Sequence, residues 1–209
     1  MLIPFDQLFR RHNVKLNQVL HVGANTGQEA IEYQRHGAKE VWWVEAHQPT
    51  YQKLLAHLNN FPGHSALNVC VSNVDGAKVD FHVANNGAQS SSILEFGTHT
   101  KEHPTVQFVS NVPMSTMRLD TLAKDCGIEF EDDAFLNIDL QGAEMLALEG
   151  LGNQLEKFKH LYLEVNEREL YKGCVLVGDL DHWLAHRGFV GKEVHMTGSG
   201  WGDKFYQRV

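Results

Sequence analysis

The sequence predicts an α/β fold in which a mostly parallel sheet carries helices on both faces. Apolar runs of strand length alternate along the chain with segments whose apolar residues recur at helical spacing. The clearest unit, residues 18–35, joins an apolar run, a glycine-rich turn and a helical pattern. A chain of 209 residues, 43% of them hydrophobic, suffices for a sizeable core, so we expect one domain spanning residues 1–209.

The N-terminal third supplies the first three strands. The apolar residues near the N-terminus should pack a short leading helix onto the sheet. We expect strands at residues 18–22, 41–44 and 66–71, separated by helices that end near residue 35 and cover residues 49–58. Gly37 fits the end of the first of these helices, and Pro49 fits the first turn of the second.

After the third strand the chain departs from simple alternation. Asp75 and Gly76 mark a tight turn before residues 78–83, where apolar residues alternate as in a half-buried strand. We therefore expect an extra β-hairpin inserted here, and residues 106–112 can form a further strand. The irregular stretch 84–105 is either a functional lid or a mobile connection.

The C-terminal half returns to alternating helices and strands. We expect helices at residues 119–126, 143–150 and about 180–184, with strands at 134–138 and 160–165. Residues 189–194 and 205–209 should close the sheet as an antiparallel pair around a loop at 197–203.

The glycine-rich turn after the first strand indicates the ligand. Gly23, Asn25 and Gly27 have the spacing G-x-N-x-G, and glycine lets a ligand approach the backbone closely. The dinucleotide fingerprint G-x-G-x-x-G is absent, which favours S-adenosylmethionine, a ligand without phosphate. Glu45 ends the second strand about 20 residues later, where an acidic side chain can bind both ribose hydroxyls. Its alternative role is that of a solvated strand end.

Several polar residues follow strands that should end at one edge of the sheet, where ligands of open α/β sheets bind. Besides the glycine turn and Glu45, they are Ser72, Asp139 and Glu164. Asp139 could orient the amino group of the cofactor or take the proton of an acceptor hydroxyl; alternatively, it caps the following helix. Glu164 is either a second carboxylate on the acceptor side or a paired charge at the rim. Glu144, in the first turn of a helix, could simply interact favourably with the positive end of the helix dipole.

The charge and the cysteine content limit which partners and which cellular compartment are expected. The formal net charge is −8 and no dense run of Lys or Arg occurs, which favours a small or neutral acceptor over nucleic acid. The three cysteines are widely spaced and form no C-x-x-C motif, so we expect reduced thiols in a cytoplasmic protein. The cysteines are Cys70, Cys126 and Cys174. No stretch has the length of a membrane-spanning helix and no signal-peptide pattern occurs, so no membrane association is expected.

The thirteen histidines raise the question of a metal. Two pairs, His99 with His103 and His182 with His186, are spaced i, i+4. Neither pair has the H-E-x-x-H form, and no cysteine cluster completes a ligand set, so we expect no structural metal.

Five short segments carry a resemblance to one enzyme family. They are residues 21–29, 43–46, 118–120, 136–144 and 201–203, and they occur in the expected order over nearly the whole chain. The segment Ile-Asp-Leu-Gln-Gly-Ala-Glu at 138–144 is similar to the family signature Ile-Asp-Val-Glu-Gly-Ala-Glu, and a serine-rich stretch at 90–93 matches as well. The chain resembles the FkbM-type S-adenosylmethionine-dependent methyltransferases.

The resemblance implies a Rossmann-like, seven-stranded methyltransferase sheet and O-methylation of a small molecule or a sugar or glycan, with S-adenosylhomocysteine as the second product. The cofactor-binding residues would be His21, Gly23, Ala24, Asn25, Gly27, Glu45, Ala46, Val71, Ser72 and Asp139. Asp139 and Glu164 would be catalytic. The chain departs from the family at His21, where many relatives have Asp, and at Gln141, which replaces Glu.

The expected reaction is a direct displacement in which the acceptor oxygen attacks the sulfonium methyl group. In a less favoured version, Asp139, Glu164 and Asn166 bind a divalent cation such as magnesium, which polarises the hydroxyl. Two other functions stay open: a nicotinamide-dependent oxidoreductase, in which Glu45 also binds a ribose, and a non-catalytic module that binds the cofactor or its product.

The acceptor and the oligomeric state are not readable from the sequence. The 84–105 and 197–203 loops are the expected sites of acceptor selectivity. Trp201 and Tyr171 could stack on a sugar ring or could belong to the core.

Overall fold

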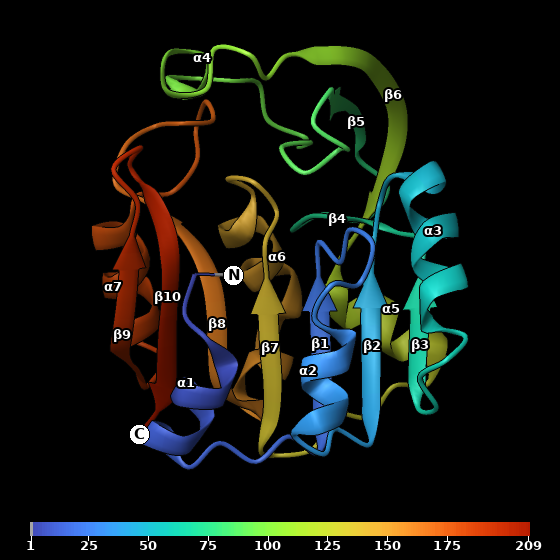
Figure 1. The fold of residues 1–209 in the computed structure, drawn as a ribbon, viewed down its shortest axis with the longest axis vertical. Helices are drawn as coiled ribbons and strands as arrows, with labels where there is room; N and C mark the ends of the chain where they lie inside the picture. The colour runs from blue at the N-terminus through green and yellow to red at the C-terminus, as the bar shows by residue number, and fades with distance from the viewer. Residues whose placement is uncertain (1) are drawn as a thin grey trace.

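The computed structural model describes residues 2–209 and contains a seven-stranded sheet with the strand order β3-β2-β1-β7-β8-β10-β9 (Figure 1). The first five strands in this order are parallel, and β10 is antiparallel to both of its neighbours. The strands are β1 Gln18–Val22, β2 Glu40–Val44, β3 His64–Leu67, β7 Ala134–Ile138, β8 Phe158–Asn166, β9 Phe189–Met196 and β10 Trp201–Arg208. The predicted α/β class and mostly parallel, seven-stranded sheet are confirmed.

Every residue of the central strands β1 and β7 is buried, because both faces of the sheet are covered. In their register, Val22 lies beside Val44 of β2 and Ile138 of β7. The chain therefore leaves these three strands at one level. The strand order reverses between β1 and β7, which is where open α/β sheets bind their ligands.

Two layers of helices cover the sheet. The elements are α1 Phe5–His12, α2 Ala30–Arg35, α3 Gln48–Leu58, α5 Leu119–Cys126, α6 Glu144–Leu151, the 3-10 helix Gly152–Lys157 and α7 Val177–Ala185. Alternate strand residues point to opposite faces, so Val19 and Trp43 pack with α1, α2 and α3. Leu20 and Leu136 pack on the other face with α5, α6 and α7. No helix among residues 2–209 is long and apolar enough to cross a membrane.

The expected third strand, residues 66–71, is interrupted. It divides into β3 and the short β4 Cys70–Val71, which belongs to a second sheet of order β4-β6-β5. The break lies at Asn68, whose side-chain amide donates to the carbonyl oxygens of Glu45 at 2.7 Å and Ala46 at 2.9 Å. These bonds turn the chain away from the main sheet.

The inserted strands form an antiparallel pair, as predicted for this region. They are β5 Lys78–Ala84 and β6 Phe108–Met117. The second begins and ends later than the predicted 106–112, because its C-terminal end also pairs with β4.

The chain between β5 and β6, residues 85–107, crosses above the main sheet and contains the short helix α4 His99–Glu102 (Figure 1). We call it the roof segment. It is bonded to the chain at 167–174 through Gly97 N to Leu170 O at 2.7 Å and Lys172 N to Glu95 O at 2.8 Å. The ordered pairing favours the lid interpretation of this stretch over a loose connection.

The predicted loop at 197–203 is shorter in the structure. Trp201 and Asp203 lie on β10, where they pair with Asn166 and Glu164 of β8. The prediction was wrong because the turn is tight: Thr197 donates both its amide and its hydroxyl to the carbonyl of Trp201, each at 2.7 Å. The strand β10 therefore begins at Trp201, inside the segment predicted as a loop and directly after Gly198 to Gly200.

Candidate active site

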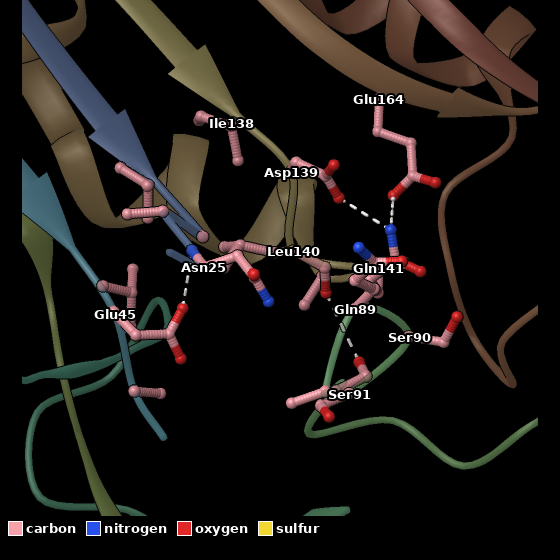
Figure 2. A pocket seen from close by; sticks show the side chains of 18 of the residues that line it. Asn25, Glu45, Gln89, Ser90, Ser91, Ile138, Asp139, Leu140, Gln141 and Glu164 are labelled. Carbon is pink, nitrogen blue, oxygen red and sulfur yellow. Dashed lines mark hydrogen bonds between the residues drawn. The ribbon is translucent and has the colours of Figure 1, made fainter. Parts of the chain in front are cut away.

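A cavity of about 430 Å³ lies at the carboxyl ends of β1, β2, β7 and β8, with the roof segment forming its opposite wall. This volume is in the range of small-molecule sites. Figure 2 shows Asn25 and Glu45 on one side of it, with Asp139, Gln141 and Glu164 on the other. The alternation of strands and helices thus brings together most of the predicted site residues.

The glycine turn is built for close backbone approach. Gly23 has φ +82°, and its amide donates to Val44 O at 2.9 Å. A Cβ atom at this position would lie 1.7 Å from the carbonyl oxygen of Asp139, so only glycine fits. Asn25 holds the turn as predicted, with its side-chain oxygen accepting from Thr26 N at 2.9 Å.

Gly27, a predicted cofactor residue, is not part of the cavity wall. It has φ +77°, and an added Cβ would meet the Leu54 side chain at 2.8 Å. Its position lets the turn pack against α3, so it shapes the site only from outside. Ala24 and Ala46 do line the cavity.

Glu45 is a bonded, buried carboxylate rather than a solvated strand end. It is 8% exposed, its Oε2 accepts from Asn25 N at 2.9 Å, and its Oε1 accepts from His47 N at 2.8 Å. Burial raises the pKa of Glu45 to about 7. Each oxygen keeps a lone pair for a further donor, such as a ribose hydroxyl.

Beyond Glu45 the wall is apolar, formed by Val69, Val71 and Phe81. Ser72 was predicted to lie here but faces away: its hydroxyl donates to Asn73 at 3.3 Å, and its carbonyl packs against Gly150. The correction follows from the short β4, which turns residue 72 out of the wall. Phe81 was not predicted as a site residue, since the alternation in β5 does not reveal which face meets the ligand.

His21, the departure in the first motif, lies beneath the cavity with 3% exposure. Its ring stacks on Trp43 with centroids 4.8 Å apart, and its Nδ1 is 3.1 Å from the hydroxyl of Tyr33. Burial lowers the pKa of His21 to about 3, so the imidazole is neutral at physiological pH. The ring is integrated into the core beside the cofactor turn.

Asp139 and Glu164 lie at the ends of neighbouring strands, and one amide joins them. Gln141 Nε2 donates to Asp139 Oδ1 at 2.7 Å and to Glu164 Oε2 at 2.9 Å (Figure 2). Asp139 opens to the cavity, whereas Glu164 is 5% exposed. Loss of solvent around Asp139 raises the pKa of its carboxyl group. Burial, and then the charge of Asp139, raise the pKa of Glu164 well above its usual value. Asp139 is not a helix cap, because α6 begins at Glu144.

Glu144 supports this arrangement from below. It is 1% exposed, and its Oε1 accepts from Leu140 N at 2.9 Å and from Gly142 N at 3.0 Å. Burial, and then the neighbouring Asp139, raise its pKa to about 7. Its carboxylate closes the turn between β7 and α6, a local role that helix-dipole reasoning did not suggest.

Tyr162 and Asp203, which were not predicted as site residues, complete the acceptor side together with Tyr171, which belongs to the core, the second of its two predicted alternatives. The Tyr171 hydroxyl donates to Gln141 Oε1 at 2.7 Å. Asp203 accepts from the Tyr162 hydroxyl and lines the cavity beside Glu164. Only the match at residues 201–203 could have indicated Asp203; nothing local to Tyr171 reveals its partner.

The two histidine pairs have different surroundings. His99 and His103 line the roof side of the cavity. His182 lies on α7 and His186 directly follows that helix; their Nε2 atoms are 3.1 Å apart.

Comparisons with known proteins identify the family of the chain. The model of the methyltransferase FkbM domain matches residues 21–190. The 2-O-methyltransferase NoeI of Sinorhizobium fredii (strain NBRC 101917 / NGR234) is 26% identical over 162 residues, which cover 74% of this chain and 65% of NoeI. The match thus leaves about a third of that relative's length uncovered.

Solved structures show the same fold at low identity. Magnesium protoporphyrin IX methyltransferase from Synechocystis PCC 6803, with bound S-adenosylmethionine, aligns with a TM-score of 0.54 at 12% identity, covering 98% of this chain and 76% of that one. A methyltransferase from Aquifex aeolicus that depends on the same cofactor aligns with a TM-score of 0.51 at 13% identity. This alignment covers 100% of this chain and 91% of that one. The chain belongs to the FkbM family of methyltransferases.

Proposed function

We propose that the chain is an O-methyltransferase that acts on a hydroxyl group of a small molecule or glycan. The observation that carries the proposal is the pair of carboxylates, Asp139 and Glu164, at the cavity wall. Two such groups beside the cofactor turn provide a proton acceptor where an acceptor hydroxyl would enter. The similarity to NoeI, a 2-O-methyltransferase, supports transfer to oxygen.

The residues of the cavity fit the cofactor. In our proposal Glu45 accepts hydrogen bonds from the ribose, and the wall of Val69, Val71 and Phe81 receives the adenine. In the same proposal, the remainder of the cofactor lies along Gly23 and Ala24, which line the cavity. Carboxylates are also the favourable surroundings for a cationic sulfonium.

When bound, S-adenosylmethionine supplies a methyl group on a positively charged sulfur, which leaves as a thioether once the acceptor oxygen takes the methyl group. The chain's own task is to hold the acceptor hydroxyl in line and to remove its proton. We propose that Asp139 or Glu164 accepts this proton; both side chains accept hydrogen bonds from the Gln141 amide. Burial raises the pKa of both carboxyl groups and so increases their affinity for a proton.

The charges of the wall favour an uncharged acceptor. Among residues 2–209, no lysine or arginine lines the cavity, and its carboxylates are Glu29, Glu45, Asp139, Glu164 and Asp203. A phosphate or a nucleic-acid backbone would enter this site without a counter-ion. The side chain of Trp201, which is partly exposed and also lines the cavity, could stack on a sugar ring, whereas Tyr171 is buried in the core.

A turnover assay tests the proposal. The protein is incubated with S-adenosylmethionine and a panel of neutral glycosides, and S-adenosylhomocysteine is quantified for wild type and Asp139→Asn. We expect acceptor-dependent turnover that falls by about 10²–10⁴-fold in the variant. Binding of S-adenosylhomocysteine without turnover on any acceptor would favour the non-catalytic module, and binding of a nicotinamide cofactor alone would favour the oxidoreductase.

We also propose a cytoplasmic location. The observation behind it is that Cys70, Cys126 and Cys174 are all free thiols. Free thiols persist in a reducing compartment. Thiol titration of the protein purified from its native cells, expected to give three reduced cysteines, checks this assignment.

A further inference from the structure

Gln141 occupies the centre of the acceptor-side network. Its Nε2 carries two protons and uses one for each carboxylate, Asp139 at 2.7 Å and Glu164 at 2.9 Å (Figure 2). The Tyr171 hydroxyl donates to Oε1 at 2.7 Å and so fixes which end of the amide faces the carboxylates. With the amide reversed, its oxygen would face two carboxylates, a repulsive arrangement.

The backbone is shaped to hold this residue in place. Gln141 has φ 54°, a conformation that residues with a side chain rarely adopt. The Glu144 carboxylate stabilises it by accepting the amides on both sides, those of Leu140 and Gly142. The unusual conformation is thus maintained by specific bonds, as is typical of functional turns.

The network contains an excess of negative charge. The ionisable groups around Gln141 come from five parts of the fold: Asp139 at the end of β7, Glu144 of α6, Glu164 of β8, Asp203 of β10 and Tyr171 of the 167–174 chain, with Glu29 and Glu45 nearby. Oxygens of Asp139, Glu144 and Glu164 lie within 4.8 Å of one another, a spacing that would also suit a cation. The Gln141 amide, however, already bridges two of them.

We propose that Gln141 is a positioning residue that takes the place of a cation between Asp139 and Glu164, so that this site holds both carboxylates ready without a divalent metal. The catalytic part of this inference rests on the proposed function. The hydrogen-bond geometry around Gln141 does not depend on it. Glutamate at position 141 would remove the two donated hydrogen bonds and add an oxygen ligand. Gln141→Glu should therefore convert the network into a binding site for a divalent cation.

Manganese titration in the presence of saturating S-adenosylhomocysteine tests the inference directly. Calorimetry on the full-length wild type should show no saturable binding at this site at millimolar Mn²⁺. Gln141→Glu should bind Mn²⁺ at least about tenfold more tightly than wild type, and Glu164→Gln added to it should abolish that gain. Saturable wild-type binding that Glu164→Gln abolishes would overturn the inference.

A second readout uses the charge of the cofactor. Gln141→Met keeps the length of the side chain but loses its donors, so the two carboxylates should hold a proton more readily and attract the sulfonium less. The preference for S-adenosylmethionine over S-adenosylhomocysteine should fall by about tenfold, the effect of one pKa unit. An unchanged preference would contradict a positioning role. Failure of wild type to bind either S-adenosylmethionine or S-adenosylhomocysteine would instead contradict the proposed function. The Mn²⁺ titration of wild type remains informative even if a variant does not fold.

Discussion

The carbonyl oxygen of Asp139 occupies the space in which a side chain at Gly23 would begin, 1.7 Å from the position of its Cβ. The cofactor turn after β1 and the carboxylate turn after β7 are therefore packed backbone against backbone. This contact links the part of the cavity assigned to the cofactor with the part assigned to proton removal.

Gly23→Ala should destabilise the protein and abolish binding of S-adenosylhomocysteine. The added methyl group meets backbone that cannot move without separating β1 from β7, and φ +82° adds strain. We expect a loss of about 3–5 kcal/mol in the free energy of unfolding, measured by urea denaturation. Gly76→Ala is the control, because Gly76 has φ +74° but no atom within 4 Å of its Cβ position, so only about 1 kcal/mol should be lost. Equal losses in the two variants would show that the contact is unimportant.

Glu164→Gln should stabilise the protein at high pH. The folded pKa of Glu164 lies above its ordinary value of 4.5, so its contribution to stability is full below that pH and is lost as pH rises through the folded pKa. Glutamine can still accept from Gln141 and has no such loss. The unfolding free energy of the variant should therefore increase relative to that of wild type as the pH rises from 5 to 8.

The exposed Glu149→Gln serves as the matched control and should show no such trend. A Glu164→Gln variant that loses stability relative to wild type as pH rises would contradict the charge assignment. Its turnover should nevertheless fall, because the carboxylate is proposed to be part of the catalytic pair.

His160→Phe should stabilise the protein, most strongly in acid. Both ring nitrogens of His160 are buried and have no hydrogen-bond partner among residues 2–209, and the ring stacks on Phe205 with centroids 5.7 Å apart. Burial lowers the pKa of His160 to about 4, so its contribution is full above pH 6.5 and is lost as pH falls towards 4.

Removal of these unsatisfied groups should raise the free energy of unfolding by about 1–2 kcal/mol at pH 7, and by more at pH 5. Chemical denaturation at pH 7 and pH 5 measures the gain in unfolding free energy at each pH. His195→Phe, at an exposed position of β9, should change stability by less than about 0.5 kcal/mol. A destabilised His160→Phe would mean that the imidazole is bonded in solution.

The parts of the fold that follow from local pattern were predictable. The bounds of β7, residues 134–138, were predicted correctly because a mostly apolar run, broken only by Asn137, lies between Asp133 and Asp139. The break after β3 was not, because it depends on the Asn68 side chain reaching carbonyls more than 20 residues away in sequence. The position of Ser72 was wrong for the same reason.

The candidate site was predictable only to the level of strand ends. Glu45 and Asp139 could be placed at the cavity because parallel strands end at one edge. The bond from Tyr171 to Gln141 joins residues 30 apart in sequence, and no local pattern encodes it. The role of Gln141 therefore required the three-dimensional arrangement, although the sequence had already indicated that this position departs from its family.

Titration calorimetry with S-adenosylhomocysteine tests the central claim most directly, using wild type and Glu45→Ala, with Glu32→Ala on α2 as the control. We predict saturable one-site binding that is weakened by roughly 10–100-fold in Glu45→Ala, because two hydrogen bonds to a charged group are lost, and unchanged in Glu32→Ala. No binding by folded wild type, or equal affinities for wild type and Glu45→Ala, would contradict the assignment of this cavity to the methyl donor.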